Sequence, residues 1–160
     1  MKLVLLPLEE NDQSWIRSVM LREWGDERVI VHSEFFTPHL LPGYKAVKSE
    51  QMVGLITYQV NVDHCEIVTL NAFQQGQGVG RALMEKVEET AKMAGCLVCR
   101  LVTTNDNLTA LGFYQKIGYH ISGIRCGAVE ESRKLKPSIP LIAENGIPIR
   151  DEITLEKVLL

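Results

Sequence analysis

The chain has 160 residues, of which 46% are hydrophobic and 23% are charged. This length predicts a single domain over residues 1–160, and the composition is that of a globular protein rather than a fibre or a disordered chain. The formal net charge of −3 provides no basic surface, so neither nucleic acid nor a membrane is expected as a partner. The apolar start Met1–Leu6 ends at Pro7, which is too early for a signal peptide or a membrane span, and we therefore expect a cytoplasmic protein.

The four cysteines raise the question of a metal or redox site. Cys96 and Cys99 have the CxxC spacing of such sites. However, they fall in an apolar run that predicts a buried strand, on which residues three apart point to opposite faces. No second CxxC and no HxxxH pattern follows. We interpret these residues as buried structural thiols and expect no metal.

The first half of the chain predicts one helix followed by strands. Apolar residues at helical spacing predict a helix over 13–24, which Asn11 or Asp12 can cap and Gly25 ends. Four stretches of strand character follow, separated by turn-forming residues: 28–36, 44–49, 52–62 and 64–72. The last three are predicted to form an antiparallel meander.

The second half alternates helix and strand. Apolar residues recur every four positions from Val79 to Ala91, with charged residues on the other faces, which predicts an amphipathic helix ended by Gly95. The further predicted elements are a strand over 97–103, a helix over 108–117, a strand over 119–125, a helix over 128–135 and a last strand over 153–159. The passage 64–103 then forms a βαβ unit with parallel strands, so we expect an α/β fold with a mixed central sheet flanked by helices.

A glycine-rich loop joins the predicted strand 64–72 to the helix that follows. It reads Gln75-Gly76-Gln77-Gly78-Val79-Gly80-Arg81. Glycines at alternate positions remove side chains where a ligand approaches the backbone, and the amides and dipole of the first helical turn favour an anion there. Arg81 adds a positive charge. A phosphate or pyrophosphate is the expected occupant, although the loop alone also fits a simple tight turn; GxGxxG and Gly-Lys-Ser/Thr motifs are absent.

Two motifs in this part of the chain resemble the GNAT superfamily of N-acetyltransferases. Gln75-x-x-Gly78-x-Gly80 is similar to the Q/R-x-x-G-x-G/A signature whose backbone amides hold the pyrophosphate of CoA, and the segment from Asn107 to Tyr119 resembles a second family motif. The resemblance covers about residues 9–125. It implies a GNAT fold with a splayed strand pair after the meander, and acetyl-CoA as the acetyl-donor cosubstrate.

The resemblance also implies roles for residues around the loop. The strand that precedes the loop pairs with the pantetheine arm in this family, which here points to Leu70, Asn71 and Ala72. The motif tyrosine, Tyr114, is implied as the acid that protonates the CoA sulfur. Helical spacing places Asn107, Leu111 and Tyr114 on one face, with Ala110, Phe113 and Ile117 as a neighbouring stripe suited to the core. A packing role for Tyr114 stays open.

Several further roles remain open at this point. Asn107 is expected to cap its helix and also to contact the cofactor, and Asn105 to line the same cleft. Glu66 is the candidate general base; alternation along the strand places it on one face with Val68 and Leu70, either partly buried or exposed. The alternative bases are His64, His120 and bulk water.

The acceptor is expected to be a primary amine of a small molecule, peptide or protein, which the resemblance implies. Acidic residues are candidates for holding a cationic amine, and two histidines are ambiguous: Glu34, Glu144, Asp151, Glu152, His32 and His39. A non-catalytic acyl-CoA-binding regulatory module and an acyltransferase that uses another acyl-CoA are the alternatives. The protein is expected to be a monomer or a homodimer.

Overall fold

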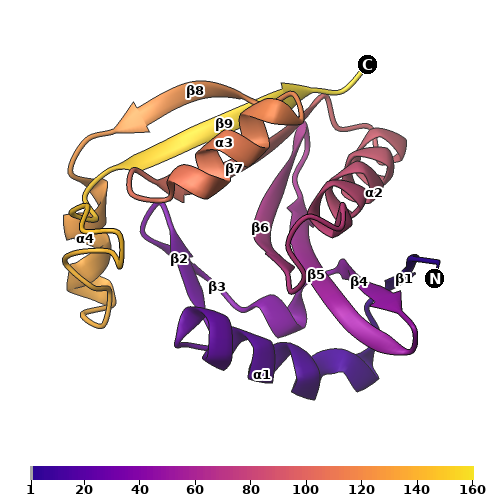
Figure 1. Cartoon of the computed structure of the whole chain (residues 1–160). Coiled ribbons are helices and arrows are strands. Elements are labelled where there is room, and N and C mark those ends of the chain that lie inside the picture. Colours follow the sequence, from indigo (N-terminus) through magenta and orange to yellow (C-terminus); the bar gives the residue numbers. More distant parts are fainter. Residues whose placement is uncertain (1) are drawn as a thin grey trace. The chain divides into compact units, whose positions relative to one another are not determined.

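The computed structural model describes residues 2–160 (Figure 1). Its contacts group the chain into two compact units. The first contains the chain up to Val29, then Thr37–Cys99 and Val158–Leu160, and the second contains Ile30–Phe36 and Arg100–Lys157. One domain over the whole chain stays a prediction.

The first unit is built on antiparallel strands. These are β1 (Val4–Pro7), β4 (Gly43–Lys48), β5 (Gln51–Val60) and β6 (His64–Ala72), which follow one another in the sheet in this order. Each neighbouring pair is antiparallel, so the predicted meander is confirmed. Strand β1 is an addition, because the apolar start of the chain was not predicted as a strand.

Two helices cover opposite faces of this meander. They are α1 (Gln13–Trp24), which follows the short helix η1 (Glu10–Asp12), and α2 (Val79–Met93). The hydroxyl of Tyr44 lies 2.6 Å from that of Thr90 on α2, whereas the ammonium group of its neighbour Lys45 donates to Asp12 at the start of α1. Adjacent strand residues point to opposite faces, so α1 and α2 lie on different sides of β4.

The predicted helix ends agree with the structure. Gly25 follows α1 with a φ of 74°, a left-handed conformation that glycine adopts without steric cost. The apolar stripe of α2 is fully buried at Leu83, Val87 and Ala91, against β4, β5 and β6. Gly54 of β5 has no room for a Cβ atom, because that atom would lie 2.6 Å from Val79.

The second unit contains most or all of seven further elements. These are β2 (Val29–Val31), β3 (Glu34–Phe36), β7 (Val98–Thr104), α3 (Leu108–Lys116), β8 (His120–Arg125), α4 (Ala128–Leu135) and β9 (Glu152–Val158). Val29, Val98, Cys99 and Val158 belong to the first unit. Strand β9 lies between β7 and β8 and pairs with β8 antiparallel. The single strand predicted over 28–36 is wrong: β2 and β3 form a hairpin, because His32 and Ser33 turn the chain with φ values of 50° and 62°.

The segment between α4 and β9 is held by the half-buried side chain of Arg133. Arg133 donates to the carbonyl oxygens of Ile139, Pro140 and Ile149 at 3.3, 2.7 and 2.6 Å. An arginine that satisfies several main-chain oxygens fixes a loop that has no regular structure. This agrees with the predicted shaped loop. No helix among residues 2–160 has the length and apolar character needed to cross a membrane.

Three of the cysteines are buried thiols, as the sequence indicated for the CxxC pair. Cys65, Cys96 and Cys99 are buried, and Cys126 is exposed. A side-chain hydrogen bond to Cys99 and burial raise the pKa of the Cys65 thiol, so it stays protonated and unreactive at neutral pH. Cys96 precedes β7 rather than lying on it, which corrects the predicted start of that strand.

Candidate active site

The glycine loop lies in the first unit and is open to solvent. Gly76 and Gly78 have φ values of 73° and 74°, and a Cβ atom at either position would meet nothing within 4 Å. Gly78 is the N-cap of α2, whose first turn has neither a capping side chain nor an acidic residue. The loop therefore presents uncapped backbone amides at the positive end of a helix, which is the arrangement that binds a phosphate group.

Two cationic side chains lie at this loop. Arg81 is on the first turn of α2 and forms an exposed ion pair with Glu85 at 3.1 Å. Lys48, at the end of β4, donates to the side-chain oxygen of Gln77 at 3.3 Å. The sequence analysis missed Lys48, because this residue is 29 positions from Gln77 and only the β4–β5 hairpin brings it to the loop.

The strand that leads into the loop is interrupted by a β-bulge. In the β5–β6 register Thr57 pairs with Thr69 while Tyr58 pairs with Ile67, so Val68 has no partner on β5. The hydroxyls of Thr57 and Thr69 are 2.6 Å apart, and both residues are buried. A bulge breaks the regular ladder and changes the direction in which neighbouring side chains point.

The bulge corrects the predicted face of Glu66. Directly paired residues of an antiparallel ladder share a face, and Glu66 pairs with Gln59. Gln59 and Thr57 alternate onto the same side of β5, so Glu66 shares its face with Thr69 and not with Leu70. This is the α1 side of the sheet. Of the two predicted environments the buried one is right, since the residue is 8% exposed.

The three residues predicted to accompany the pantetheine arm lie at the end of β6. Leu70, Asn71 and Ala72 are half-buried and pair on one edge with β5. The side chain of Asn71 accepts a hydrogen bond from the indole of Trp24 at 3.1 Å, so it ties the end of α1 to the strand. Contact of these residues with the cofactor stays a prediction.

The second predicted motif lies in the second unit. The side-chain oxygen of Asn107 accepts a hydrogen bond from the amide of Ala110 at 3.4 Å, which confirms the predicted cap of α3. Both polar atoms of the Asn105 side chain form hydrogen bonds. Its nitrogen donates to the carbonyl oxygen of Pro148, and its oxygen accepts from the backbone amides of Arg150 and Asp151, all at 2.9 Å. Asn105 therefore secures the segment before β9, and cofactor contacts by both asparagines stay predictions.

Tyr114 is half-buried on α3, and its ring packs edge-to-face against Phe113 and Tyr119 at centroid distances of 5.3 and 6.1 Å. Desolvation raises the pKa of its hydroxyl to about 12. The phenol therefore keeps its proton throughout the physiological range. The predicted apolar stripe of Ala110, Phe113 and Ile117 is only half-buried, and no residue of α3 is fully buried.

The other candidate bases and amine-binding groups have different surroundings. His64 contacts Asp63 and Asn61 through its two ring nitrogens at 2.9 and 3.1 Å, and His120 is exposed. Glu152 is buried and lies within 3.4 Å of both His32 and Arg125. These three residues fix the β2–β3 hairpin to β9. Asp151 accepts from the amide of Gly127, while Glu34 and Glu144 are exposed.

The predicted site residues thus fall into two groups. The loop, Leu70–Ala72 and Glu66 belong to the first unit, and Asn105, Asn107 and Tyr114 belong to the second. Among residues 2–160 no group of three or more histidine, cysteine or acidic side chains could hold a metal ion.

Known proteins are similar to this chain in sequence and in fold. The model of the acetyltransferase (GNAT) family matches residues 9–119. The chain belongs to the GNAT acetyltransferase family. The uncharacterised Bacillus subtilis proteins YdhI and YxbD are 40% identical to this GNAT protein over 158 and 156 residues, with at least 97% of each chain covered.

Solved structures confirm the GNAT fold, a mixed α/β fold with a sheet flanked by helices. An IAA acetyltransferase from Bacillus cereus has a TM-score of 0.75 at 23% identity, with 99% of this chain and 100% of that chain covered. A Bacillus subtilis acetyltransferase in complex with CoA has a TM-score of 0.72 at 24% identity over 99% and 100% of the chains. An Elizabethkingia anophelis GNAT acetyltransferase with acetyl-CoA bound has a TM-score of 0.70 at 20% identity over 98% of each chain.

Proposed function

We propose that this GNAT protein transfers the acetyl group of acetyl-CoA to a primary amine. The observation that carries the proposal is the uncapped start of α2, where Gly76 and Gly78 adopt left-handed conformations and leave open space above the backbone. CoA and acetyl-CoA in the structures of two GNAT neighbours support this choice of ligand.

In this proposal the first unit holds the donor. The amides at the start of α2 bind the pyrophosphate, with Arg81 as a nearby positive charge. The backbone of Leu70, Asn71 and Ala72 aligns the pantetheine arm. Amide groups of the same strand support the carbonyl oxygen of the thioester as negative charge develops on it.

Chemistry then requires two proton transfers. The neutral amine nitrogen attacks the thioester carbon, and its surplus proton passes to Glu66, directly or through water. The tetrahedral intermediate collapses, the carbon–sulfur bond breaks, and the CoA thiolate takes the proton of the Tyr114 hydroxyl. Burial of Glu66 suits a base, and the raised pKa of Tyr114 keeps its hydroxyl protonated at neutral pH.

The proposal is tested by release of free CoA from acetyl-CoA in the presence of a panel of amines, peptides and aminoglycosides. Turnover with at least one amine and mass-spectrometric detection of its acetylated product are the expected results. Tight binding of acetyl-CoA without turnover on any amine would instead identify a non-catalytic acyl-CoA-binding module. Faster turnover of succinyl-CoA or another acyl-CoA would reassign the donor.

A further inference from the structure

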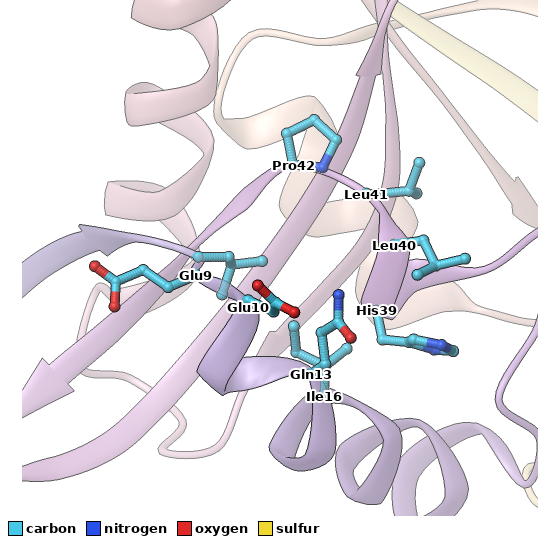
Figure 2. A pocket seen from close by; sticks show the side chains of 9 residues that line it. Glu9, Glu10, Gln13, Ile16, His39, Leu40, Leu41 and Pro42 are labelled. Carbon is cyan, nitrogen blue, oxygen red and sulfur yellow. The ribbon is translucent and has the colours of Figure 1, made fainter.

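A pocket of about 310 Å³ opens in the first unit between the start of α1 and the short helix η2 (Pro38–Leu40). One side is polar and is formed by Glu10, Gln13 and His39, while Leu40 and Leu41 contribute apolar surface (Figure 2). A small organic molecule with both a charged and an apolar part fits such a lining.

Glu10 supplies the charge of this pocket. Its side chain is exposed, and no cation among residues 2–160 forms an ion pair with it. Figure 2 shows its carboxylate beside the amide of Gln13, whereas the carboxylate of Glu9 points away from them. Capping at the start of the helix is already provided by Asp12, which accepts the amide of Glu9 at 2.8 Å. Glu10 is therefore available to a ligand cation.

His39 adds a second, independent feature. It is 9% exposed, and its Nε2 lies 3.3 Å from the guanidinium of Arg17. Because arginine can only donate, Nε2 accepts and the proton is on Nδ1. This N–H group is buried and has no hydrogen-bond partner among residues 2–160. A buried donor without an acceptor is costly, and an oxygen atom of a ligand that reached this group would remove that cost.

The pocket is close to the proposed reaction centre on the same side of the sheet. The carbonyl of Pro42, at its rim, accepts a hydrogen bond from the amide of Tyr58, and the next residue of β5, Gln59, pairs with Glu66. Two strand spacings therefore separate the rim from Glu66, which is about 10 Å. Glu66 and α1 lie on the same face of the meander.

We propose that this pocket binds a second ammonium group of the acceptor, so that the substrates are diamines that carry an oxygen atom close to one amine. The ammonium group contacts Glu10 and Gln13, the carbon chain packs on Leu40 and Leu41, and the reacting amine lies toward Glu66. This inference rests on the proposed function, because it concerns the acceptor of that reaction.

The test compares L-lysinamide with L-norleucinamide, whose side chain has no ammonium group. Wild-type protein is expected to prefer lysinamide in kcat/KM by about tenfold, since a hydrogen bond to a charged group is lost with norleucinamide. Glu10→Gln should remove this preference, and Gln13→Glu should increase it. Glu89→Gln, an exposed carboxylate on α2, is the matched control and should leave it unchanged.

Three results would overturn the inference: no preference in the wild type, an unchanged preference in Glu10→Gln, or acetylation of the side-chain amine of lysinamide in place of its α-amine. Calorimetric binding of lysinamide to protein without CoA separates this inference from the proposed function. Binding that depends on Glu10 without any turnover would retain the pocket and reject the acetyl transfer. Turnover that does not depend on Glu10 would retain the acetyl transfer and reject the role of the pocket.

Discussion

The ammonium group of Lys48 and the side-chain oxygen of Gln77 are 3.3 Å apart, which joins the tip of the β4–β5 hairpin to the glycine loop. The tip itself is a tight turn in which Ser49 and Glu50 have φ values of 54° and 63°. This turn holds the end of β4 in place. Lys48 is thereby kept at the glycine loop, whose backbone amides are uncapped. Within the loop sequence 75–81 the one cationic residue is Arg81.

Lys48→Gln is expected to weaken the affinity for CoA about three- to tenfold, because an exposed cation near phosphate groups contributes modestly and in a salt-dependent way. Calorimetry at low and high salt measures this, and the variant should show a smaller salt effect than the wild type. Lys92→Gln, at the other end of α2, is the control for loss of one positive charge. Equal affinities of both variants would exclude a direct role for Lys48.

Gly78→Glu is expected to abolish CoA binding, since the side chain enters the open space above the loop and repels the pyrophosphate. Backbone strain must be separated from this effect. Gly127 is the N-cap of α4 with a φ of 72°, close to the 74° of Gly78, and also has open space around it. Gly127→Ala and Gly78→Ala should therefore lower the free energy of unfolding alike, each by about 1 kcal/mol.

In this comparison CoA affinity, measured by calorimetry, decides the assignment. Gly127→Ala should bind CoA like the wild type. Gly78→Glu protein that is folded and retains full affinity would show that the loop is only a tight turn.

The elements that the sequence predicted well are those with strong local signals. Helix α2 has an apolar residue every four positions and a glycine shortly after its end, and its predicted start agrees with the structure. Strand β1 has only four residues, and no alternation of apolar and polar side chains develops over that length. The turn at His32 and Ser33 was missed because neither residue is glycine or asparagine, which give the strongest sequence signal for a left-handed turn.

The parts of the site whose backbone conformation follows from a local motif could be predicted from the sequence. The parts that depend on how two strands pair could not. Gly76 and Gly78 adopt the left-handed conformations that glycine favours, so the loop followed from the sequence. The bulge at Val68 depends on how β6 pairs with β5, and a pattern within one strand contains no such information. The face of Glu66 was predicted wrongly for that reason.

Tyr114→Phe is expected to lower kcat by roughly a hundredfold or more, with little change in acetyl-CoA affinity, because only the proton donor is removed. In the wild type a pKa of about 12 keeps the phenol protonated, so its ionisation should produce no alkaline limb in the rate profile below pH 10. Spectrophotometric titration should show one high-pH phenolate transition fewer in the variant. Full activity of Tyr114→Phe would leave this ring a packing role only.

The same titration has a consequence for stability. Because the folded-state pKa of Tyr114 is raised above the ordinary value of 10.0, the folded protein holds this proton more tightly than the unfolded chain does. Stability from this group is fully present below pH 10 and is lost as pH rises toward 12. Tyr58, whose pKa burial also raises to about 12, acts in the same window.

Glu66→Gln is expected to lower kcat and to flatten the acid side of the pH–rate profile, because the amide keeps the shape of the side chain but cannot accept the amine proton. The affinity for acetyl-CoA should stay the same, which calorimetry measures. A profile identical to that of the wild type would leave water or a histidine, His64 or His120, as the base. Recovery of the wild-type profile by Glu66→Asp through an ordered water would support a base that acts at a distance.

Lys45→Met is expected to destabilise the fold by about 3 kcal/mol, because it leaves a buried carboxylate without its cation. Asp12 is 4% exposed and accepts from Lys45 through both oxygens, at 2.8 and 3.0 Å. Urea unfolding measures the loss. The double variant Asp12→Asn/Lys45→Met should be more stable than Lys45→Met alone, since the uncompensated charge is then absent; additive losses would show that the two groups do not interact.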